Sequence, residues 1–166
     1  RTTTLYNLDS SGDNKYGEEQ SVTDRNGNKT EYVRDTNGNV TRIYHPDSTY
    51  TEYAYDSKNN KISERDENGK YTFYLYDTNG INLEKKAQPL NGTDPYTRGC
   101  DESGFAVTTY VYYTDAEAQT LGYKAKGLLK SETDPVGSVT QYTYDADGNK
   151  RTVTDPEGAV TTYNYN

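Results

Sequence analysis

The sequence predicts an all-β protein, an antiparallel β-hairpin repeat array that forms a spiralling or solenoid-like single-layer sheet. Three observations lead to this fold class. A glycine position recurs at a spacing of 21 residues, threonine and tyrosine alternate between the turns, and the turns themselves are short. Alternation with a period of two places side chains on one face of a strand, and short connections favour antiparallel neighbours.

One glycine position defines the repeat, and it is occupied by Gly17, Gly38, Asn59, Gly80, Gly127 and Gly148. The successive spacings are 21, 21, 21, 47 and 21 residues, so a single interval is longer than the others. A fixed period of this kind indicates a repeat architecture. We therefore predict a single array over residues 1–166, with about six 21-residue units and insertions near residues 84–103 and 114–126.

Two kinds of turn separate the strands of each unit. One reads Asp-x-x-Gly, and the other is represented by Asp155-Pro156-Glu157-Gly158. Aspartate can bond to the backbone two residues further on, and glycine accepts the left-handed conformation that such hairpin turns need. Asparagine is the next most tolerant residue, which explains Asn59. The predicted turn aspartates are Asp35, Asp56, Asp77 and Asp145.

Tyrosine and threonine alternate along every second strand and are therefore expected on one face of the sheet. Arg34 is an exception, because it occupies a position that is tyrosine in other units. The opposite face carries residues such as Glu31 and Glu52, with Phe73 and Leu75 as its apolar residues. The predicted structural tyrosines are Tyr32, Tyr53, Tyr55, Tyr74, Tyr76, Tyr110, Tyr112, Tyr142, Tyr144, Tyr163 and Tyr165.

Tyrosine replaces aliphatic residues as the main buried material. The chain has 19 tyrosines, whereas Leu, Ile, Val and Phe together make up roughly an eighth of it. So low an aliphatic content usually indicates disorder, but tyrosine and threonine suit a half-buried pleated surface. The net charge of -8 disfavours nucleic acid and anionic membranes as partners, and no stretch is long and apolar enough for membrane insertion.

Candidates for chemistry are few. His45 is the only histidine and Cys100 the only cysteine, but His45-Pro46 occupies the position of Asp155-Pro156, so a turn substitution is the simpler interpretation. The run from Asp145 to Asn149 resembles a calcium loop, but its glycine stands two places too early. We therefore expect no catalytic, cofactor-binding or metal-binding residues, and no cofactor.

The motif Tyr-x-Tyr-Asp-x-x-Gly-Asn, followed by Asp-Pro-x-Gly and Thr-x-Tyr, resembles the Rhs/YD-repeat family over nearly the whole chain outside the insertions. That family includes bacterial Rhs and Tc toxin shells and the animal teneurins. The resemblance implies hairpins joined into a long spiralling sheet, which in bacterial toxin complexes encloses a toxic segment. It also implies a secreted or surface-displayed bacterial protein.

The expected function is that of a structural scaffold, either as part of a toxin-encapsulating shell or assembling edge to edge into a filament. The expected partners are adjoining repeats or copies of the chain, because open sheet edges present unpaired backbone groups. The alternative is an extracellular carbohydrate-binding adhesion module that uses the tyrosine rows. The two insertions are expected to be loops at the rim of the sheet, the second with a helix-favouring run from Asp115 to Gln119.

Overall fold

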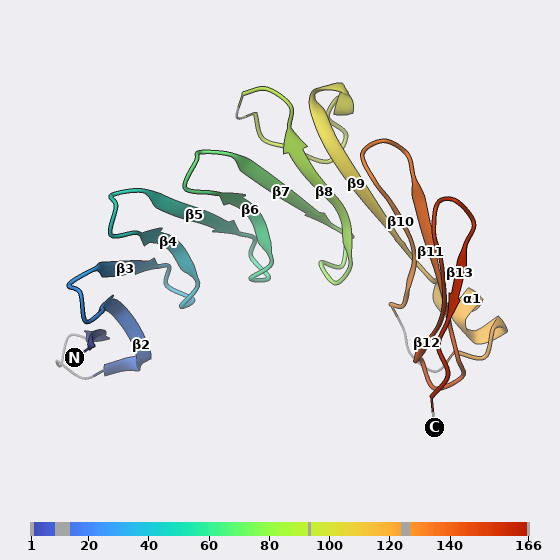
Figure 1. Ribbon diagram of the computed structural model, residues 1–166, viewed down its shortest axis with the longest axis horizontal. Helices are drawn as coiled ribbons and strands as arrows, with labels where there is room; N and C mark the ends of the chain where they lie inside the picture. The colour runs from blue at the N-terminus through green and yellow to red at the C-terminus, as the bar shows by residue number, and fades with distance from the viewer. Residues whose placement is uncertain (1, 9–13, 93, 124–126, 166) are drawn as a thin grey trace. The chain divides into compact units, whose positions relative to one another are not determined.

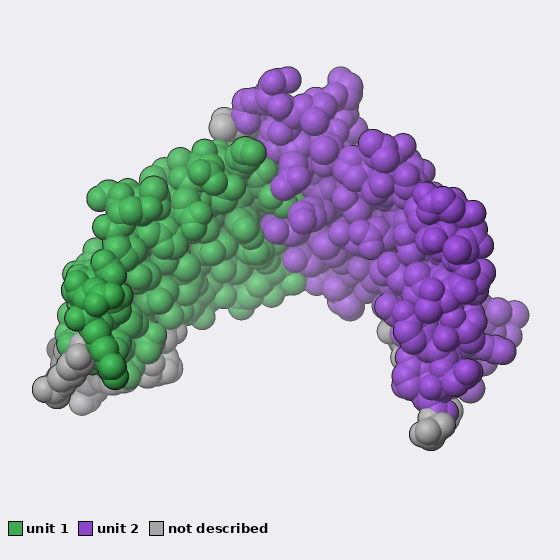
Figure 2. All heavy atoms as spheres, in the orientation of Figure 1, with its two compact units in different colours: residues 1–73 green, residues 74–166 purple. Residues whose placement is uncertain are grey.

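The protein is an open antiparallel β-sheet, seen in a computed structural model that describes residues 2–8, 14–92, 94–123 and 127–165 (Figure 1). Thirteen strands of these residues follow one another in the sheet in the order of the chain. The predicted fold class, an all-β array of antiparallel hairpins, is confirmed. The chain divides into two compact units, residues 1–73 and 74–166, which Figure 2 colours separately.

The first unit is built from three hairpins and the first half of a seventh strand. Some of its cross-strand pairs place threonine opposite an aliphatic residue, as in Val22 opposite Thr30 and Ile43 opposite Thr51. Its strands are β1 (Thr3–Leu8), β2 (Asn14–Thr23), β3 (Lys29–Arg34), β4 (Val40–Tyr44), β5 (Tyr50–Tyr55), β6 (Lys61–Arg65) and β7 (Tyr71–Tyr76).

The predicted turn at Gly17 is wrong, because Gly17 lies inside β2. The reason is the length of the first hairpin. Leu8 pairs with Asn14, and β2 is 10 residues long where β4 has 5, so Gly17 is a strand residue. Two register shifts along β1 accompany this longer strand. The 21-residue period therefore does not extend to the first hairpin.

The second unit continues the same arrangement but carries the two insertions. The first insertion is shorter than predicted, because residues 84–89 belong to β8 and pair with β9. The segment that leaves the sheet begins at Leu90 and ends at Gly104, whose carbonyl accepts from the Leu90 N–H at 2.9 Å. The elements are β8 (Leu83–Pro89), η1 (Glu102–Gly104), β9 (Phe105–Tyr112), α1 (Asp115–Thr120), β10 (Leu129–Thr133), β11 (Val139–Tyr144), β12 (Lys150–Thr154) and β13 (Val160–Thr162).

The predicted helical run in the second insertion forms α1. Thr114 caps it, because the Thr114 hydroxyl accepts from the Glu117 N–H while the Glu117 carboxylate accepts from the Thr114 N–H. This reciprocal pair satisfies two backbone donors that a helix start leaves unpaired. Ala118 is the residue of α1 that is buried.

A register shift recurs where each repeat passes from a tyrosine strand to the next strand. Tyr55 pairs with Lys61 and Ala54 pairs with Ser63, so Ile62 is the extra residue. The β11–β12 pair repeats this shift, with Tyr144 opposite Lys150 and Thr143 opposite Thr152. Such bulges bend a strand and increase its local twist. The repeat thus specifies a curved strand pair, a feature that the tyrosine alternation alone does not reveal.

Candidate functional site

The hairpin turns are held by the aspartate side chain in a way that recurs along the chain, seen most fully at Asp56. One Asp56 carboxylate oxygen accepts from the backbone N–H groups of Lys58 and Asn60 at 2.8 and 2.9 Å. The other accepts from the Asn60 side-chain amide at 3.1 Å. Asn59 adopts a φ of 64° in the glycine position, and its N–H donates to the Asp56 carbonyl at 3.1 Å. The aspartate therefore acts as a turn-forming group.

The same carboxylate contact occurs in both kinds of turn. In each case the aspartate accepts from the backbone N–H four residues further on. It is made by Asp24, Asp35, Asp56, Asp66, Asp77, Asp134, Asp145 and Asp155. The glycine position has a positive φ at Gly38, Gly80 and Gly148, and also at Gly127, which follows the second insertion rather than an aspartate turn.

These hydrogen bonds favour the ionised carboxylates. Hydrogen bonds from Asn39 lower the pKa of Asp35 below its ordinary value of 3.8, and those from Asn149 do the same for Asp145. Asp145 uses one oxygen for the N–H groups of Asp147 and Asn149 and the other for the Asn149 side chain. In the residues that the structure describes, no three His, Cys, Asp or Glu side chains are grouped so as to hold a metal ion.

Among the short hairpin turns that the structure describes, the one that begins at His45 lacks an initial aspartate. The His45 N–H donates to the Thr49 carbonyl at 3.0 Å, so the turn keeps the usual backbone closure. Asp47 takes over as acceptor, because its carboxylate receives the Thr49 N–H at 3.0 Å and the Thr49 hydroxyl at 2.7 Å. The His45 ring bonds through Nε2 to the Thr51 hydroxyl at 2.9 Å. Ser48 stands in the glycine position with a φ of 69°.

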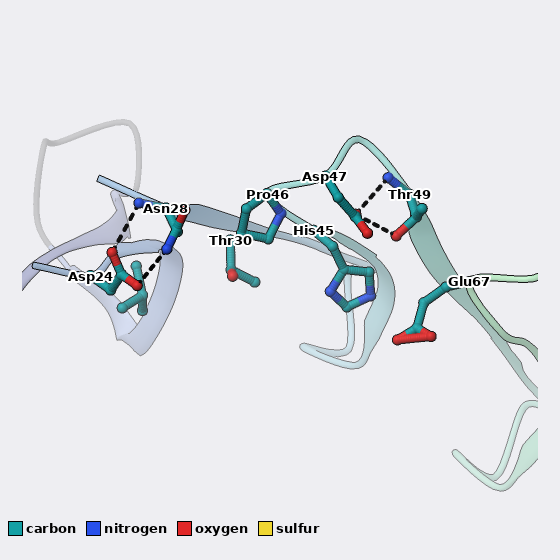
Figure 3. A pocket seen from close by; sticks show the side chains of 9 residues that line it. Asp24, Asn28, Thr30, His45, Pro46, Asp47, Thr49 and Glu67 are labelled. Atoms are coloured by element: carbon teal, nitrogen blue, oxygen red, sulfur yellow. Dashed lines mark hydrogen bonds between the residues drawn. The ribbon is translucent and has the colours of Figure 1, made fainter. Parts of the chain in front are cut away.

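An open pocket of about 530 Å³ surrounds this turn (Figure 3). Figure 3 shows the His45 ring between Thr30 and the Glu67 carboxylate, with the Asp24 and Asp47 side chains bonded to their own turns. The pocket is lined by Val22, Asp24, Asn28, Thr30, His45, Pro46, Asp47, Thr49 and Glu67. Cys100 belongs to the first insertion, where it is a partly exposed free thiol.

The second tyrosine of the motif connects neighbouring strands through its hydroxyl. Tyr55 of β5 donates to the carbonyl of Val40, the first residue of β4, at 3.1 Å. Tyr112 of β9 reaches the first residue of β8, Leu83, at 3.0 Å. Tyr144 of β11 reaches the first residue of β10, Leu129, at 2.9 Å. The same contact occurs in three repeats. In each, the hydroxyl adds a side-chain hydrogen bond between the tyrosine strand and the first residue of the preceding strand.

The first tyrosine of the motif packs against a lysine in two repeats. The Lys61 ammonium lies 5.4 Å from the Tyr53 ring centre, and the Lys150 ammonium lies 4.8 Å from that of Tyr142. Each lysine is the first residue after the hairpin turn, so the turn brings the cation over the ring. Contacts of this kind contribute about 0.5–1 kcal/mol at exposed sites.

Partial burial of the tyrosine face changes the ionisation of its phenols. Burial raises the pKa of Tyr53, Tyr110, Tyr112, Tyr142 and Tyr144 above the ordinary value of 10.0. Tyr110 is electrostatically coupled to Tyr74 and Tyr142 as well as to Tyr112. The predicted tyrosines of β7, β9 and β11 are thus brought together on one face. Tyr32 in β3 and Tyr76 in β7 are half-buried like them.

The second insertion adds aromatic residues around Tyr144. The rings of Tyr113 and Tyr123 meet Tyr144 edge to face, with centroids 6.3 and 5.9 Å away. The Tyr113 hydroxyl donates to the Tyr142 carbonyl at 2.9 Å, and burial raises the Tyr113 pKa to about 12. Tyr144 is only 9% exposed as a result, whereas Tyr163 and Tyr165 are 42% and 55% exposed.

The opposite face has packing that the sequence interpretation missed. Arg42 lies 4.9 Å from the Tyr50 ring centre and forms an ion pair with Glu52, while Arg65 lies 4.2 Å from the same ring. Tyr44 stands directly across from Tyr50. The signal was present, since Arg42 with Tyr44 and Tyr50 with Glu52 also alternate with a period of two.

The first insertion covers part of this opposite face in the second unit. Tyr96 meets Phe105 edge to face at 5.2 Å, and Ala87, on the same face as its cross-strand neighbours Val107 and Phe105, is completely buried. The Tyr96 hydroxyl donates to Glu102, which also accepts from Lys85. Burial, followed by this hydrogen bond, raises the Tyr96 pKa. The insertion is therefore a packed element of the second unit.

Comparison with known proteins identifies the repeat. The family model described as RHS Repeat matches residues 34–71 and 123–160. No curated protein matches the chain. The crystal structure of TcdB2-TccC3-TEV is 12% identical, with a TM-score of 0.56, over 97% of this chain and 8% of that chain. The Tc holotoxin pore of Photorhabdus luminescens, with a TccC3 mutation, is 18% identical with a TM-score of 0.48 over 96% of this chain and 9% of that chain.

The matched segments coincide with the hairpins described above. Residues 34–71 include β4, β5 and β6, and residues 123–160 include β10, β11 and β12. The TcdB2-TccC3-TEV structure shares the fold, and this chain spans 8% of its length. The two model matches, together with the repeated turns and tyrosine contacts, show that these hairpins are RHS repeats, as the resemblance to the Rhs/YD-repeat family implied.

Proposed function

We propose that the chain is a structural segment of a secreted bacterial shell that encloses a toxic cargo. The observation that carries this proposal is the use of the repeat's side chains for internal packing. The tyrosine hydroxyls of Tyr55, Tyr112 and Tyr144 bond to carbonyls of the adjacent strand, and the turn carboxylates bond to their own backbone. Groups used in this way build a stiff wall. Among the described residues, no helix is long and apolar enough to cross a membrane.

The outer edge of β13 supports the proposed partner, a further repeat hairpin. The sequence Val160 to Tyr165 matches Val139 to Tyr144 position by position in its Val-Thr-x-Tyr-x-Tyr pattern. Yet β11 spans 6 residues whereas β13 spans 3, and Tyr163 and Tyr165 remain exposed. In the sheet, β13 has β12 as its neighbour. We infer that this edge pairs with a strand of a further repeat, and we propose that residues 1–166 form one continuous array.

Assembly is tested by light scattering and electron microscopy of the purified chain over a range of concentrations. Closed hollow particles or filaments are expected if copies pair through their edges. A stable monomer at high concentration rejects pairing between copies. The shell proposal is tested separately, by fusing a protease-sensitive cargo to the C-terminal end of the chain and adding protease to the assembled particles. Cargo that is digested as fast as the free cargo overturns it.

Carbohydrate binding is a second candidate, supported by a pocket in the second unit that includes Tyr112 of the tyrosine rows. The pocket has a volume of about 680 Å³, within the range of about 300–1,000 Å³ typical of small-molecule sites. Tyrosine rings, amides and carboxylates suit the apolar faces and hydroxyls of a sugar. The lining residues are Asp77, Asn79, Ile81, Asn82, Tyr112, Tyr113, Thr114, Asp115 and Gly127.

A matched pair of variants tests this second candidate. Asn79 and Asn68 occupy the same position in the β7–β8 and β6–β7 turns, but only Asn79 lines the pocket. If a glycan array identifies a ligand, Asn79→Ala should abolish its binding and Asn68→Ala should preserve it. Equal loss in both variants, or no bound glycan, rejects a sugar site here.

A further inference from the structure

The chain contains five Asn-Gly steps, which are the dipeptides most open to spontaneous loss of the asparagine amide. In this reaction the glycine nitrogen bonds to the side-chain carbonyl carbon of asparagine, and ammonia leaves. Water then opens the five-membered ring to give aspartate or isoaspartate, so no oxidant or reductant is needed. By dipeptide type alone, the five steps should react at the same rate. They are Asn26-Gly27, Asn37-Gly38, Asn68-Gly69, Asn79-Gly80 and Asn91-Gly92.

Four of these steps lie in hairpin turns that hold the attacking nitrogen. Its N–H donates to the carbonyl of the turn aspartate in every case. The distances are 3.2 Å for Gly27 to Asp24, 3.1 Å for Gly38 to Asp35, 2.9 Å for Gly69 to Asp66 and 2.8 Å for Gly80 to Asp77. Ring closure requires this nitrogen to lose its proton and rotate toward the asparagine side chain, so it must first break the turn.

The asparagines of three turns are held as well. The N–H groups of Asn26, Asn37 and Asn68 donate to the carboxylates of Asp24, Asp35 and Asp66, at 2.8, 2.9 and 3.0 Å. Opening such a turn therefore disrupts two hydrogen bonds to the same aspartate. Native-state opening of this kind reduces a reaction rate by the fraction of time that the turn stays closed.

The fifth step lies outside the hairpin turns, in the insertion that follows β8. Asn91 and Gly92 are both exposed. Gly92 has a φ of 77°, and no other atom lies within contact distance of the point where a Cβ would stand. Within the described part of the chain, the Gly92 N–H makes no hydrogen bond, since the nearest backbone bond joins Leu90 to Gly104. Among the described residues, ring closure at this step breaks no backbone hydrogen bond of Gly92.

We propose that Asn91 is the site at which this protein spontaneously converts asparagine to aspartate and isoaspartate. The conversion adds one negative charge to the first insertion. An isoaspartate also adds one methylene to the backbone between β8 and the segment that carries Tyr96. The turn asparagines are protected by the same aspartates that form the hairpins.

Peptide mapping by mass spectrometry tests the proposal on the full chain, incubated at mildly alkaline pH with and without denaturant. In the native protein, Asn91 is expected to convert at least about tenfold faster than the turn asparagines, which corresponds to the local opening of their turns. In denaturant the five rates should converge. Equal native rates, or slow conversion of Asn91, overturn the proposal.

Two variants test separately the protection of Asn68 by its turn aspartate and the assignment of the reaction to Asn91. Asp66→Ala removes the carboxylate that holds Asn68 and Lys70, so it should accelerate conversion at Asn68 while leaving the Asn91 rate unchanged. Asn91→Gln should remove the dominant product. If Asp66→Ala leaves the folded protein's Asn68 rate unchanged, protection by the turn is rejected.

Discussion

At the scale of single residues, the two tyrosines of the motif have different roles. The hydroxyl of the second tyrosine bonds to the carbonyl that begins the preceding strand, as Tyr144 does with Leu129. The first tyrosine contributes its ring, which packs beneath a lysine in the pairs Tyr53–Lys61 and Tyr142–Lys150. Replacing the first tyrosine by phenylalanine should therefore cost less stability than replacing the second tyrosine by phenylalanine.

The hydroxyl of Tyr55 should contribute measurably to stability. Tyr55→Phe removes its hydrogen bond to the Val40 carbonyl and should lower the free energy of unfolding by about 0.5–1.5 kcal/mol. Tyr50→Phe is the control on the same strand, because the Tyr50 hydroxyl has no hydrogen bond within the described residues. Urea unfolding of both variants gives the comparison, and equal losses would contradict a specific role for the Tyr55 hydroxyl.

At the scale of the elements, each hairpin turn depends on one residue with a left-handed backbone. Most turns have glycine there, but β4–β5 has Ser48 at a φ of 69° and β5–β6 has Asn59 at 64°. The Asn59 side chain offsets part of the cost of this conformation, because its oxygen accepts hydrogen bonds from the side-chain amides of Asn39 at 2.9 Å and Asn37 at 3.3 Å. These bonds join two successive Asp-x-x-Gly turns.

Substitution by glycine should therefore act differently in the two turns. Ser48→Gly relieves the steric cost of the left-handed conformation and should raise the stability by up to about 1 kcal/mol. Asn59→Gly gains the same relief but loses the contacts with the preceding turn, so its net effect should be close to zero or destabilising. Thermal unfolding measures both. A larger gain for Asn59→Gly would show that the contact between the turns has no energetic value.

At the scale of the whole molecule, the ionisable groups set a pH window for stability. On the acid side, hydrogen bonds lower the pKa of five turn aspartates below 3.8, namely Asp24, Asp35, Asp56, Asp77 and Asp145. Their contribution to stability is complete above pH 3.8 and is lost as the pH falls through the folded-state pKa. On the alkaline side, burial raises the pKa of Tyr53, Tyr110, Tyr112, Tyr142 and Tyr144 above 10.0, so their contribution to stability is present below pH 10.0 and is lost as the pH rises through the folded-state pKa.

Urea unfolding measured at several pH values should show both limits. Stability should fall steeply below pH 3.8 and again above pH 10.0. Asp56→Asn removes one titrating turn carboxylate, so it should flatten the acid limb and leave the alkaline limb unchanged. An acid limb with the same slope in this variant would mean that the Asp56 turn does not contribute to it.

Much of the fold was predictable because its signals are local. The Asp-x-x-Gly turns and the alternating tyrosines are each encoded within a few residues, and Asn59 was identified as a turn residue from its neighbours in the period. The position of Gly17 was not predictable in this way, because the first hairpin is longer than the others and places Gly17 inside β2. The length of the first insertion was also mispredicted, because residues 84–89 show no tyrosine pattern and join the sheet through pairing with β9.

The sequence by itself determined the all-β hairpin fold, the turn chemistry and the tyrosine face, because strand alternation and turn preference act over short distances. Only the tertiary structure decided which carbonyl each tyrosine hydroxyl reaches, how Arg42 and Arg65 pack around Tyr50, and which face each insertion covers. Those contacts join residues up to 29 positions apart in the chain, as in Tyr112 with Leu83. Their partners depend on strand register, which no single strand specifies alone.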